Sequence, residues 1–214
     1  MKAVIFDLDG VIIHTDVYHY RAWKKLADRL DLYFDERINN RLRGVSRMES
    51  LEIILENSAF SGLSDAEKTA LADEKNETYR GFLNAMTPAD LPREVSDTLR
   101  ALRGMGFPMA IGSSSRNARL ILDKIGLSGF FDAVSDGNNI ANSKPDPEVF
   151  LKAAEFLGIA PADCVVVEDA DAGVEAARRA GMKTIAMGDA AKFGRSDWTI
   201  ESFGGILKIM KGAM

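Results

Sequence analysis

The 214-residue chain has little of what several large classes of protein depend on. It contains one cysteine, Cys164, so no disulfide framework can form within it, and its apolar neighbours suggest a core position. No apolar stretch approaches the length of a membrane span, and the one before Asp7 is too short for a signal peptide. The 27 basic residues do not outnumber the 32 acidic ones, which argues against nucleic acid as the main partner. We expect a soluble, cytoplasmic protein without nucleic-acid or membrane partners.

Strand-like apolar segments recur along most of the chain, with helical patterns between the later ones. The expected strands are 4–6, 109–111, 133–134, 165–167 and 184–187, and the expected helices between them are 116–125, 147–157 and 171–180. A glycine follows each of these helical stripes, which is a common helix C-terminal signal. Another helix is expected near 93–104, and a short strand and helix from about Trp198. This alternation predicts an α/β fold with a Rossmann-like parallel sheet covered on both faces.

The segment from about Asp16 to Met86 interrupts this alternation. It has no convincing strand, and we expect helices at 16–30, 35–43, 48–57 and 65–84. The linkers are expected at 12–15 and 86–92, and the second contains two prolines that resist helix formation. We predict an α/β core of residues 1–13 and 88–214 and an inserted helical-bundle domain of residues 14–87, which would act as a lid.

Two expected strands end in pairs of acids. Asp7 and Asp9 follow the first strand, and Glu168 and Asp169 follow the strand at 165–167. The carboxyl ends of parallel strands share one edge of a sheet, where ligands bind. Such oxygen ligands suit Mg²⁺ with a substrate phosphate. The alternative is that Asp7 and Asp9 are solvated turn residues that cap a helix.

Polar residues also follow two other expected strands. The segment 113–117 is three serines, Arg116 and Asn117, and it opens an expected helix, an arrangement that binds phosphate. Lys144 precedes Pro145 and Pro147. Taken singly, the serines are as consistent with an ordinary helix cap, and Lys144 with a solvated loop residue. Together with the acids, these segments point to phosphoryl transfer.

In this order, Asp7-Leu8-Asp9-Gly10-Val11, Ser113, Lys144 and Glu168-Asp169 resemble the four motifs of the haloacid dehalogenase superfamily. The helical insertion lies where the first subclass of that superfamily carries its cap. The helical segment also resembles the cap signature of the β-phosphoglucomutase family. The matching residues there are Thr15, His19, Trp23, Gly44, Val45, Ser46, Arg47, Ser50 and Lys75, and in the core Ser114, Ser115, Arg116 and Asn117. Two linker residues depart from the family pattern, His14 and Arg93.

The resemblance implies that β-D-glucose 1-phosphate is isomerised to glucose 6-phosphate through enzyme-bound β-glucose 1,6-bisphosphate. It makes Asp7 the nucleophile and Asp9 the general acid and base. It places Mg²⁺ on the Asp7 carboxylate, the Asp9 main-chain carbonyl and Asp169, with help from Glu168. Ser113 and Lys144 would neutralise the transferring phosphoryl group.

The remaining matched residues take roles by the same resemblance. Arg47 with Ser115, Arg116 and Asn117 would hold the second phosphate, and His19 would couple cap closure to Asp9. Two alternatives stay open: a sugar-phosphate phosphatase, in which water is the final acceptor, and a non-catalytic sugar-phosphate sensor. We expect a monomer that acts on small-molecule sugar phosphates.

Overall fold

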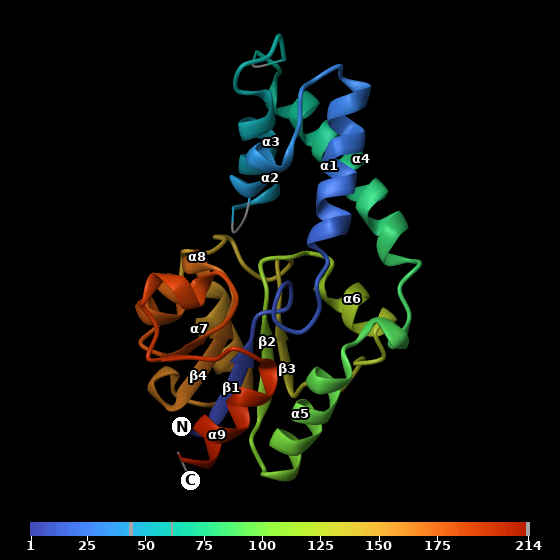
Figure 1. Cartoon of the computed structure of the whole chain (residues 1–214). Coiled ribbons are helices and arrows are strands. Elements are labelled where there is room, and N and C mark those ends of the chain that lie inside the picture. The colour runs from blue at the N-terminus through green and yellow to red at the C-terminus, as the bar shows by residue number, and fades with distance from the viewer. Residues whose placement is uncertain (43–44, 61, 213–214) are drawn as a thin grey trace. The chain divides into compact units, whose positions relative to one another are not determined.

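A computed structural model describes residues 1–42, 45–60 and 62–212 of the chain (Figure 1). The chain forms two compact units. One combines Met1–His14 with Met86–Met214, and the other is Thr15–Ala85. Each unit is described separately below.

The first unit is built on a six-stranded sheet in which every neighbouring pair of strands is parallel. The strand order is β3-β2-β1-β4-β5-β6. The strands are β1 (Ala3–Phe6), β2 (Met109–Gly112), β3 (Ala133–Ser135), β4 (Cys164–Glu168), β5 (Lys183–Ala186) and β6 (Trp198–Thr199). This topology confirms the predicted α/β fold, and it puts β1 and β4 side by side in the centre.

Alternate residues of the central strand face opposite layers of helices. Ile5 belongs to a buried cluster with Val149 and Phe150 of α7 (Glu148–Leu157) and Ala176 of α8 (Asp171–Arg179). Phe6, the next residue, stacks on Phe203 of the 3₁₀ turn η4 (Phe203–Gly205), with ring centroids 5.7 Å apart. A strand with apolar residues on both faces must be covered on both, as this one is (Figure 1).

The α-helices of this unit lie close to their predicted positions, and the four 3₁₀ turns were not predicted. The α-helices are α5 (Arg93–Gly104), α6 (Ala118–Lys124), α7 (Glu148–Leu157), α8 (Asp171–Arg179) and α9 (Ile206–Lys211), and the 3₁₀ turns are η1 (Pro88–Asp90), η2 (Pro161–Asp163), η3 (Ala190–Phe193) and η4 (Phe203–Gly205). Gly158 ends α7 in a left-handed conformation, φ +68°, as the glycine pattern predicted.

Two predictions for this unit need correction. The helix expected at 116–125 begins only at Ala118, because serine hydroxyls accept the backbone N–H groups of the preceding loop. The linker 86–92 was expected to resist helix formation, yet Pro88–Asp90 forms a single 3₁₀ turn. Thr87 accepts a hydrogen bond from the Ala89 N–H there, and proline is tolerated in a first helical turn.

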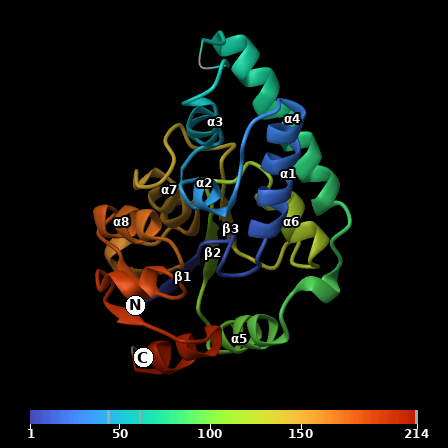
Figure 2. The same cartoon turned by 45° about the horizontal axis from the view of Figure 1, so that its top comes forward.

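The second unit is a small helical bundle. Its helices are α1 (Asp16–Arg29), α2 (Glu36–Asn40), α3 (Arg47–Leu55) and α4 (Asp65–Leu83), so α2 is shorter than the helix expected at 35–43. α1 packs along α4, as both views show (Figure 2). The hydrophobic core of this bundle includes Leu26, Phe34, Leu51 and Leu55. Across the described ranges of the chain, no helix combines the length and apolar content that a membrane crossing requires.

Candidate active site

Asp7 and Glu168 are brought together by the pairing of the two central strands. Phe6 is the register partner of Val167, so the next residue of each strand lies at the same edge of the sheet. The Asp7 N–H donates to the Val167 carbonyl over 3.0 Å, which continues the ladder by one residue. The carboxylates of Asp7, Glu168 and Asp169 each offer an oxygen, and these oxygens lie within 4.8 Å of one another.

Lys144 joins two of these carboxylates. Its Nζ donates to Asp7 Oδ1 and, over 2.5 Å, to Glu168 Oε1. The ammonium also lies 4.7 Å from the centroid of the Phe150 ring. Gly112 makes room for that ring, because a β-carbon at position 112 would lie 2.6 Å from Phe150 Cδ1. The lysine is therefore held on several sides within a buried site.

Two glycines leave the space that the carboxylates of Asp169 and Glu168 occupy. Gly10 has φ +92°, and a β-carbon there would lie 2.1 Å from Asp169 Oδ2. Its N–H donates to the Ile13 carbonyl over 2.8 Å, which closes the turn that follows Asp9. Gly173, in the first turn of α8, leaves space for the Glu168 carboxylate. Glu168 Oε2 accepts the N–H groups of Asp169 and Ala170 at 2.9 and 3.0 Å.

The charges of the three carboxylates and Lys144 together favour a bound cation. Burial raises the pKa of Asp7 well above its usual value, and although Lys144 opposes this, Glu168 and Asp169 reinforce it. Burial alone would lower the pKa of Lys144, but Asp7 and Glu168 raise it above its ordinary value. Three carboxylates against one ammonium leave an excess of negative charge in a buried site. An all-oxygen donor set of this kind fits a hard divalent cation.

The serine segment folds as a loop at the end of β2. The Ser113 N–H donates to the Ser135 carbonyl over 3.0 Å, and Ser113 Oγ accepts the N–H of Ser115 at 3.2 Å. Ser115 Oγ in turn accepts the Asn117 N–H, also at 3.2 Å. Ser114 Oγ accepts the Lys144 N–H at 3.5 Å, so this loop contacts the loop that carries the lysine. Ser113 and Asn117 are buried, and Arg116 is exposed.

A second polar cluster lies between α1 and α4 of the helical unit. Lys75 Nζ lies 2.8 Å from His19 Nδ1 and above the rings of Trp23 and Tyr79, 4.6 and 4.9 Å from their centroids. The Thr15 and Tyr79 hydroxyls are 3.0 Å apart. Burial lowers the pKa of His19 well below its usual value, and the charges of Lys75 and Arg47 lower it further.

Arg47 is the first residue of α3, where the helix dipole disfavours a cation. Side chains of α4 hold it there: Nη2 donates to Asn76 Oδ1 over 3.0 Å, and Nη1 lies 3.6 Å from Asp73 Oδ1. The guanidinium is therefore oriented by the bundle before any ligand binds.

With this geometry established, comparison with known proteins is informative. Residues 1–181 match the family model of the haloacid dehalogenase-like hydrolases. The chain belongs to this family. It is 43% identical over 189 residues to the β-phosphoglucomutase of Bacillus subtilis, covering 88% of this chain and 84% of that protein. It is also 35% identical to the fructose-1-phosphate phosphatase YqaB of Escherichia coli, covering 85% of this chain and 94% of the relative.

Solved structures agree with the sequence comparison. A crystal structure of β-phosphoglucomutase from Clostridium difficile superposes with a TM-score of 0.91 at 35% identity, covering 99% of this chain and 96% of that one. The predicted resemblance to the haloacid dehalogenase superfamily is confirmed, and so is the likeness to its β-phosphoglucomutases.

The structure gathers many of the predicted site residues into two clusters, one within each compact unit. It brings together Asp7, Lys144, Glu168 and Asp169, and in the helical unit it brings together Thr15, His19, Trp23 and Lys75. The three-carboxylate group does not include Asp9, whose predicted metal contact is through its main chain.

The other predicted cap residues lie in or beside α3. Ser46 caps this helix, because its Oγ accepts the Glu49 N–H at 3.2 Å. Ser50 is buried and Val45 is exposed. Gly44 lies outside the described residues.

Tyr79 and Phe150 are among the residues that contact the predicted site but were not singled out from the sequence. Tyr79 lies one helical turn beyond Lys75, and Phe150 lies six residues beyond Lys144. An aromatic residue on the buried stripe of a helix is typical of core packing, so the pattern alone did not indicate contacts to a lysine. The i, i+4 spacing of Lys75 and Tyr79 was the available signal.

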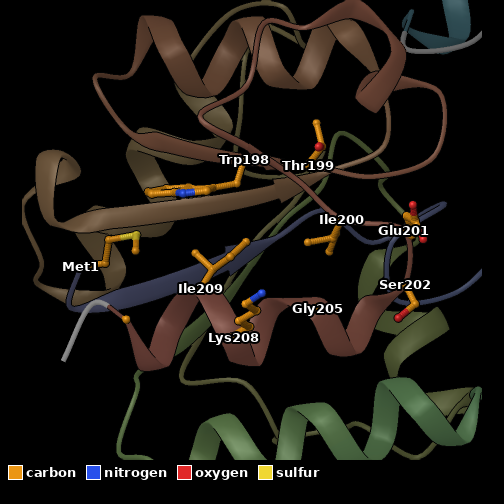
Figure 3. A pocket seen from close by; sticks show the side chains of 10 residues that line it. Met1, Trp198, Thr199, Ile200, Glu201, Ser202, Gly205, Lys208 and Ile209 are labelled. Carbon is orange, nitrogen blue, oxygen red and sulfur yellow. The ribbon is translucent and has the colours of Figure 1, made fainter.

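The first compact unit also contains a cavity that none of the predicted site residues lines. A cavity of about 680 Å³ is lined by β6, α9 and Met1, including the side chains of Trp198, Ile209 and Lys208 (Figure 3). Its lining extends from Met1, which precedes β1, to Ser202, which follows β6, and it includes none of the three carboxylates.

Proposed function

We propose that the protein is a β-phosphoglucomutase that converts β-D-glucose 1-phosphate to glucose 6-phosphate through enzyme-bound β-glucose 1,6-bisphosphate. The observation that carries the phosphoryl-transfer chemistry is the buried Asp7 carboxylate, bound by Lys144 beside Glu168 and Asp169. The preference for a mutase rests on the 43% identity to the Bacillus subtilis enzyme and on the match to the Clostridium difficile structure.

Asp7 is the proposed nucleophile. One of its carboxylate oxygens attacks the C1 phosphorus of the bisphosphate, the bond to the C1 oxygen breaks, and an aspartyl phosphate and glucose 6-phosphate form. In the second half-reaction the 6-hydroxyl of an incoming β-glucose 1-phosphate attacks the aspartyl phosphate, the bond to the Asp7 oxygen breaks, and the bisphosphate forms again. Two easier transfers thus replace one difficult transfer. Lys144 and Ser113 neutralise charge on the transferring phosphoryl oxygens.

Asp9 is the proposed general acid and base. It protonates the departing sugar oxygen in the first half-reaction and takes the proton from the attacking hydroxyl in the second. This assignment is consistent with its side chain lying outside the three-carboxylate group, because a metal-bound carboxylate would be a poor proton carrier.

We further propose Mg²⁺ as the cofactor, held by the carboxylates of Asp7, Asp169 and Glu168 and by the Asp9 carbonyl. The donor oxygens of the three carboxylates and their excess negative charge fit this ion. When bound, the ion supplies positive charge that stabilises the phosphoryl oxygens in the transition state.

The helical domain, residues 14–87, is proposed to act as the cap that excludes water, the competing phosphoryl acceptor. Arg47, with Ser115, Arg116 and Asn117, is proposed to bind the phosphate that is not being transferred. Thr15, His19, Trp23, Gly44, Val45, Ser46, Ser50, Lys75 and Ser114 complete the proposed substrate site. A monomeric state and a cytoplasmic location also stay predictions.

The alternative is a sugar-phosphate phosphatase, which the 35% identity to YqaB favours. The two activities are separated by primer dependence. A mutase needs catalytic β-glucose 1,6-bisphosphate to convert β-glucose 1-phosphate, and glucose 6-phosphate formation should rise from near zero when the primer is added with Mg²⁺. Release of inorganic phosphate at the same rate with and without primer would favour the phosphatase.

A further inference from the structure

The turn that follows β3 lies along the serine loop, residues 113–117. The Ser113 N–H donates to the carbonyl of Ser135, the last residue of β3, over 3.0 Å. Two residues further along both segments, the Gly137 N–H donates to the Ser115 carbonyl over 3.2 Å. The pairing of β2 with β3 therefore continues beyond the ends of the strands and reaches the loop.

A side-chain contact extends this row by one more residue. Asn138 Nδ2 donates to the Arg116 carbonyl over 3.0 Å. Asp136 is 1% exposed, and it holds Asn138 because its Oδ1 accepts the Asn138 N–H at 2.9 Å. Asn139 Oδ1 in turn accepts the Asp136 N–H at 3.3 Å. Residues 136–139, here named the β3 turn, thus form a hydrogen-bonded unit of their own.

The β3 turn is anchored on two helices. Arg119 of α6 places its Nε 3.3 Å from Asp136 Oδ2, and its Nη2 donates to the Val134 carbonyl over 3.3 Å. Lys152 of α7 donates to the Asn139 carbonyl. Because the turn is fixed from these two sides, it can support the serine loop rather than move with it.

Gly137 lets the turn and the loop approach closely. It is buried, and a β-carbon at position 137 would lie 2.4 Å from the Ser114 carbonyl oxygen and 2.9 Å from both the N and the Cγ of Arg116. Two of these three atoms belong to the backbone of the serine loop, so they could yield only if the loop moved. The φ of Gly137 is not positive, so this glycine is required for space and not for a special backbone conformation.

These contacts prepare the serine loop for an anion. A carbonyl oxygen directed at a phosphate would repel it, whereas amide, hydroxyl and guanidinium donors attract it. The β3 turn engages the carbonyls of Ser115 and Arg116, so both carbonyls are directed at the turn. The side chains of Arg116 and Asn117 therefore extend from a backbone that the turn has already oriented.

We propose that Gly137 and Asn138 are positioning residues that fix the serine loop in the conformation that binds the phosphate that is not being transferred. This inference rests on the proposed function, in which Arg116 and Asn117 bind that phosphate. In this role Gly137 and Asn138 do not contact the sugar phosphate, and they act through the backbone of the loop. Recognition of the sugar phosphate then depends on a turn that carries none of the proposed catalytic residues.

The orientation of the loop can be measured without any assay of activity. Residual dipolar couplings of the ligand-free protein report the directions of the amide N–H bonds of residues 115–117. These couplings should change in Gly137→Ala, and they should stay unchanged in the control Gly104→Ala, whose added carbon would have no atom within 4 Å. Asn138→Ala is the second variant, because its side chain is exposed and its removal should spare the fold. Unchanged couplings in both Gly137→Ala and Asn138→Ala would overturn the proposal.

The kinetic measurement separates positioning from general damage to the site. In Gly137→Ala, kcat/KM for isomerisation of β-glucose 1-phosphate should fall roughly tenfold to a hundredfold, as for a contact displaced by about 1 Å. Phosphorylation of Asp7 by acetyl phosphate should change little, because this donor carries no second phosphate. Equal losses in the two reactions, or unchanged isomerisation, would refute the positioning role.

A double-mutant cycle shows whether Gly137 acts through Arg116. Arg116→Ala removes the proposed phosphate contact, so the loss in Gly137→Ala combined with Arg116→Ala should be clearly smaller than the product of the two single losses. Independent losses would contradict an action through Arg116. If the wild type forms no glucose 6-phosphate but Gly137→Ala still changes the couplings, the proposed function fails and the role of the β3 turn in fixing the serine loop stands.

Discussion

A β-carbon at position 173 would lie 1.8 Å from Oε1 of Glu168, so the glycine and the carboxylate are structurally dependent on each other. Gly173 lies in the first turn of α8, and Glu168 is the last residue of β4. The missing side chain lets the carboxylate lie against the helix, where it accepts two backbone N–H groups and binds Lys144. A small residue in α8 thereby sets the position of a lysine in a distant loop.

Gly173→Ala should therefore damage the site and destabilise the fold. The methyl group would displace the Glu168 carboxylate, at a cost of about 1–3 kcal/mol in unfolding free energy, the usual range for overpacking. Urea unfolding and the isomerisation rate measure the two effects. Gly104→Ala is the control, because no atom lies within 4 Å of the added carbon, and it should be neutral or stabilising by up to about 1 kcal/mol. Equal stability of the two variants would show that Glu168 can move freely.

Asp7→Asn should abolish phosphoryl transfer, because an amide is neither a competent nucleophile nor an anionic metal ligand. Acid-quenched reactions with a radiolabelled phosphoryl donor would show no aspartyl phosphate. Turnover within about tenfold of wild type, roughly 1.4 kcal/mol in barrier, would contradict the nucleophile assignment.

Asp9→Asn should behave differently, because the main-chain carbonyl is unchanged and only proton transfer fails. We expect isomerisation to slow by a hundredfold or more, on the order typical of a general acid and base. Calorimetric Mg²⁺ titration should give an affinity close to wild type. Lost Mg²⁺ affinity with fast turnover of the metal-bound enzyme would require the roles to be reassigned.

Arg47→Ala separates the binding of a remote phosphate from the chemistry at Asp7. A charged hydrogen-bonding contact to phosphate is worth roughly tenfold to a hundredfold, and part of this should appear in the transfer rate. Isomerisation should fall by that factor, while formation and hydrolysis of the aspartyl phosphate from acetyl phosphate stay near wild type. Arg47→Lys should recover little, because lysine cannot donate two parallel hydrogen bonds. Equal losses in both assays would indicate a structural arginine.

The stability of the protein should depend on pH through His19. Its folded-state pKa lies well below the ordinary value of 6.5, so as pH falls through 6.5 the unfolded chain takes up a proton that the folded chain does not. Wild type should then lose stability relative to His19→Gln, with a slope that does not exceed about 1.4 kcal/mol per pH unit. Urea unfolding of both proteins at pH 7.5, 6.5 and 5.5 measures this difference. Parallel pH profiles would mean that His19 titrates normally in the fold.

Much of this architecture was predictable from local patterns. The apolar segment before Asp7 and the acids after 165–167 predicted parallel strands of one sheet with carboxylates at one edge, which β1 and β4 confirm; that these two strands are neighbours was not predicted. The contact between Lys144 and Asp7 joins residues 137 positions apart, so it depends on tertiary packing that no local pattern specifies. The helix expected from residue 116 begins only at Ala118, because the hydroxyls of Ser113 and Ser115 accept backbone N–H groups of the segment before it.

Tyr79 shows a different limit of sequence interpretation. Its position on the buried stripe of α4 predicts core packing, and it is indeed 1% exposed. Its contacts to His19, Lys75 and Thr15 follow from the pairing of α1 with α4, which the spacing within either helix alone does not determine.

The central claim is that phosphate moves between two positions of one sugar and is not released to water. Phosphorus NMR of the purified protein with Mg²⁺, catalytic β-glucose 1,6-bisphosphate and β-glucose 1-phosphate follows every phosphorus atom at once. We expect the 1-phosphate signal to be replaced mole for mole by glucose 6-phosphate, with inorganic phosphate at trace level. Inorganic phosphate as the main product, with no glucose 6-phosphate, would contradict the mutase assignment.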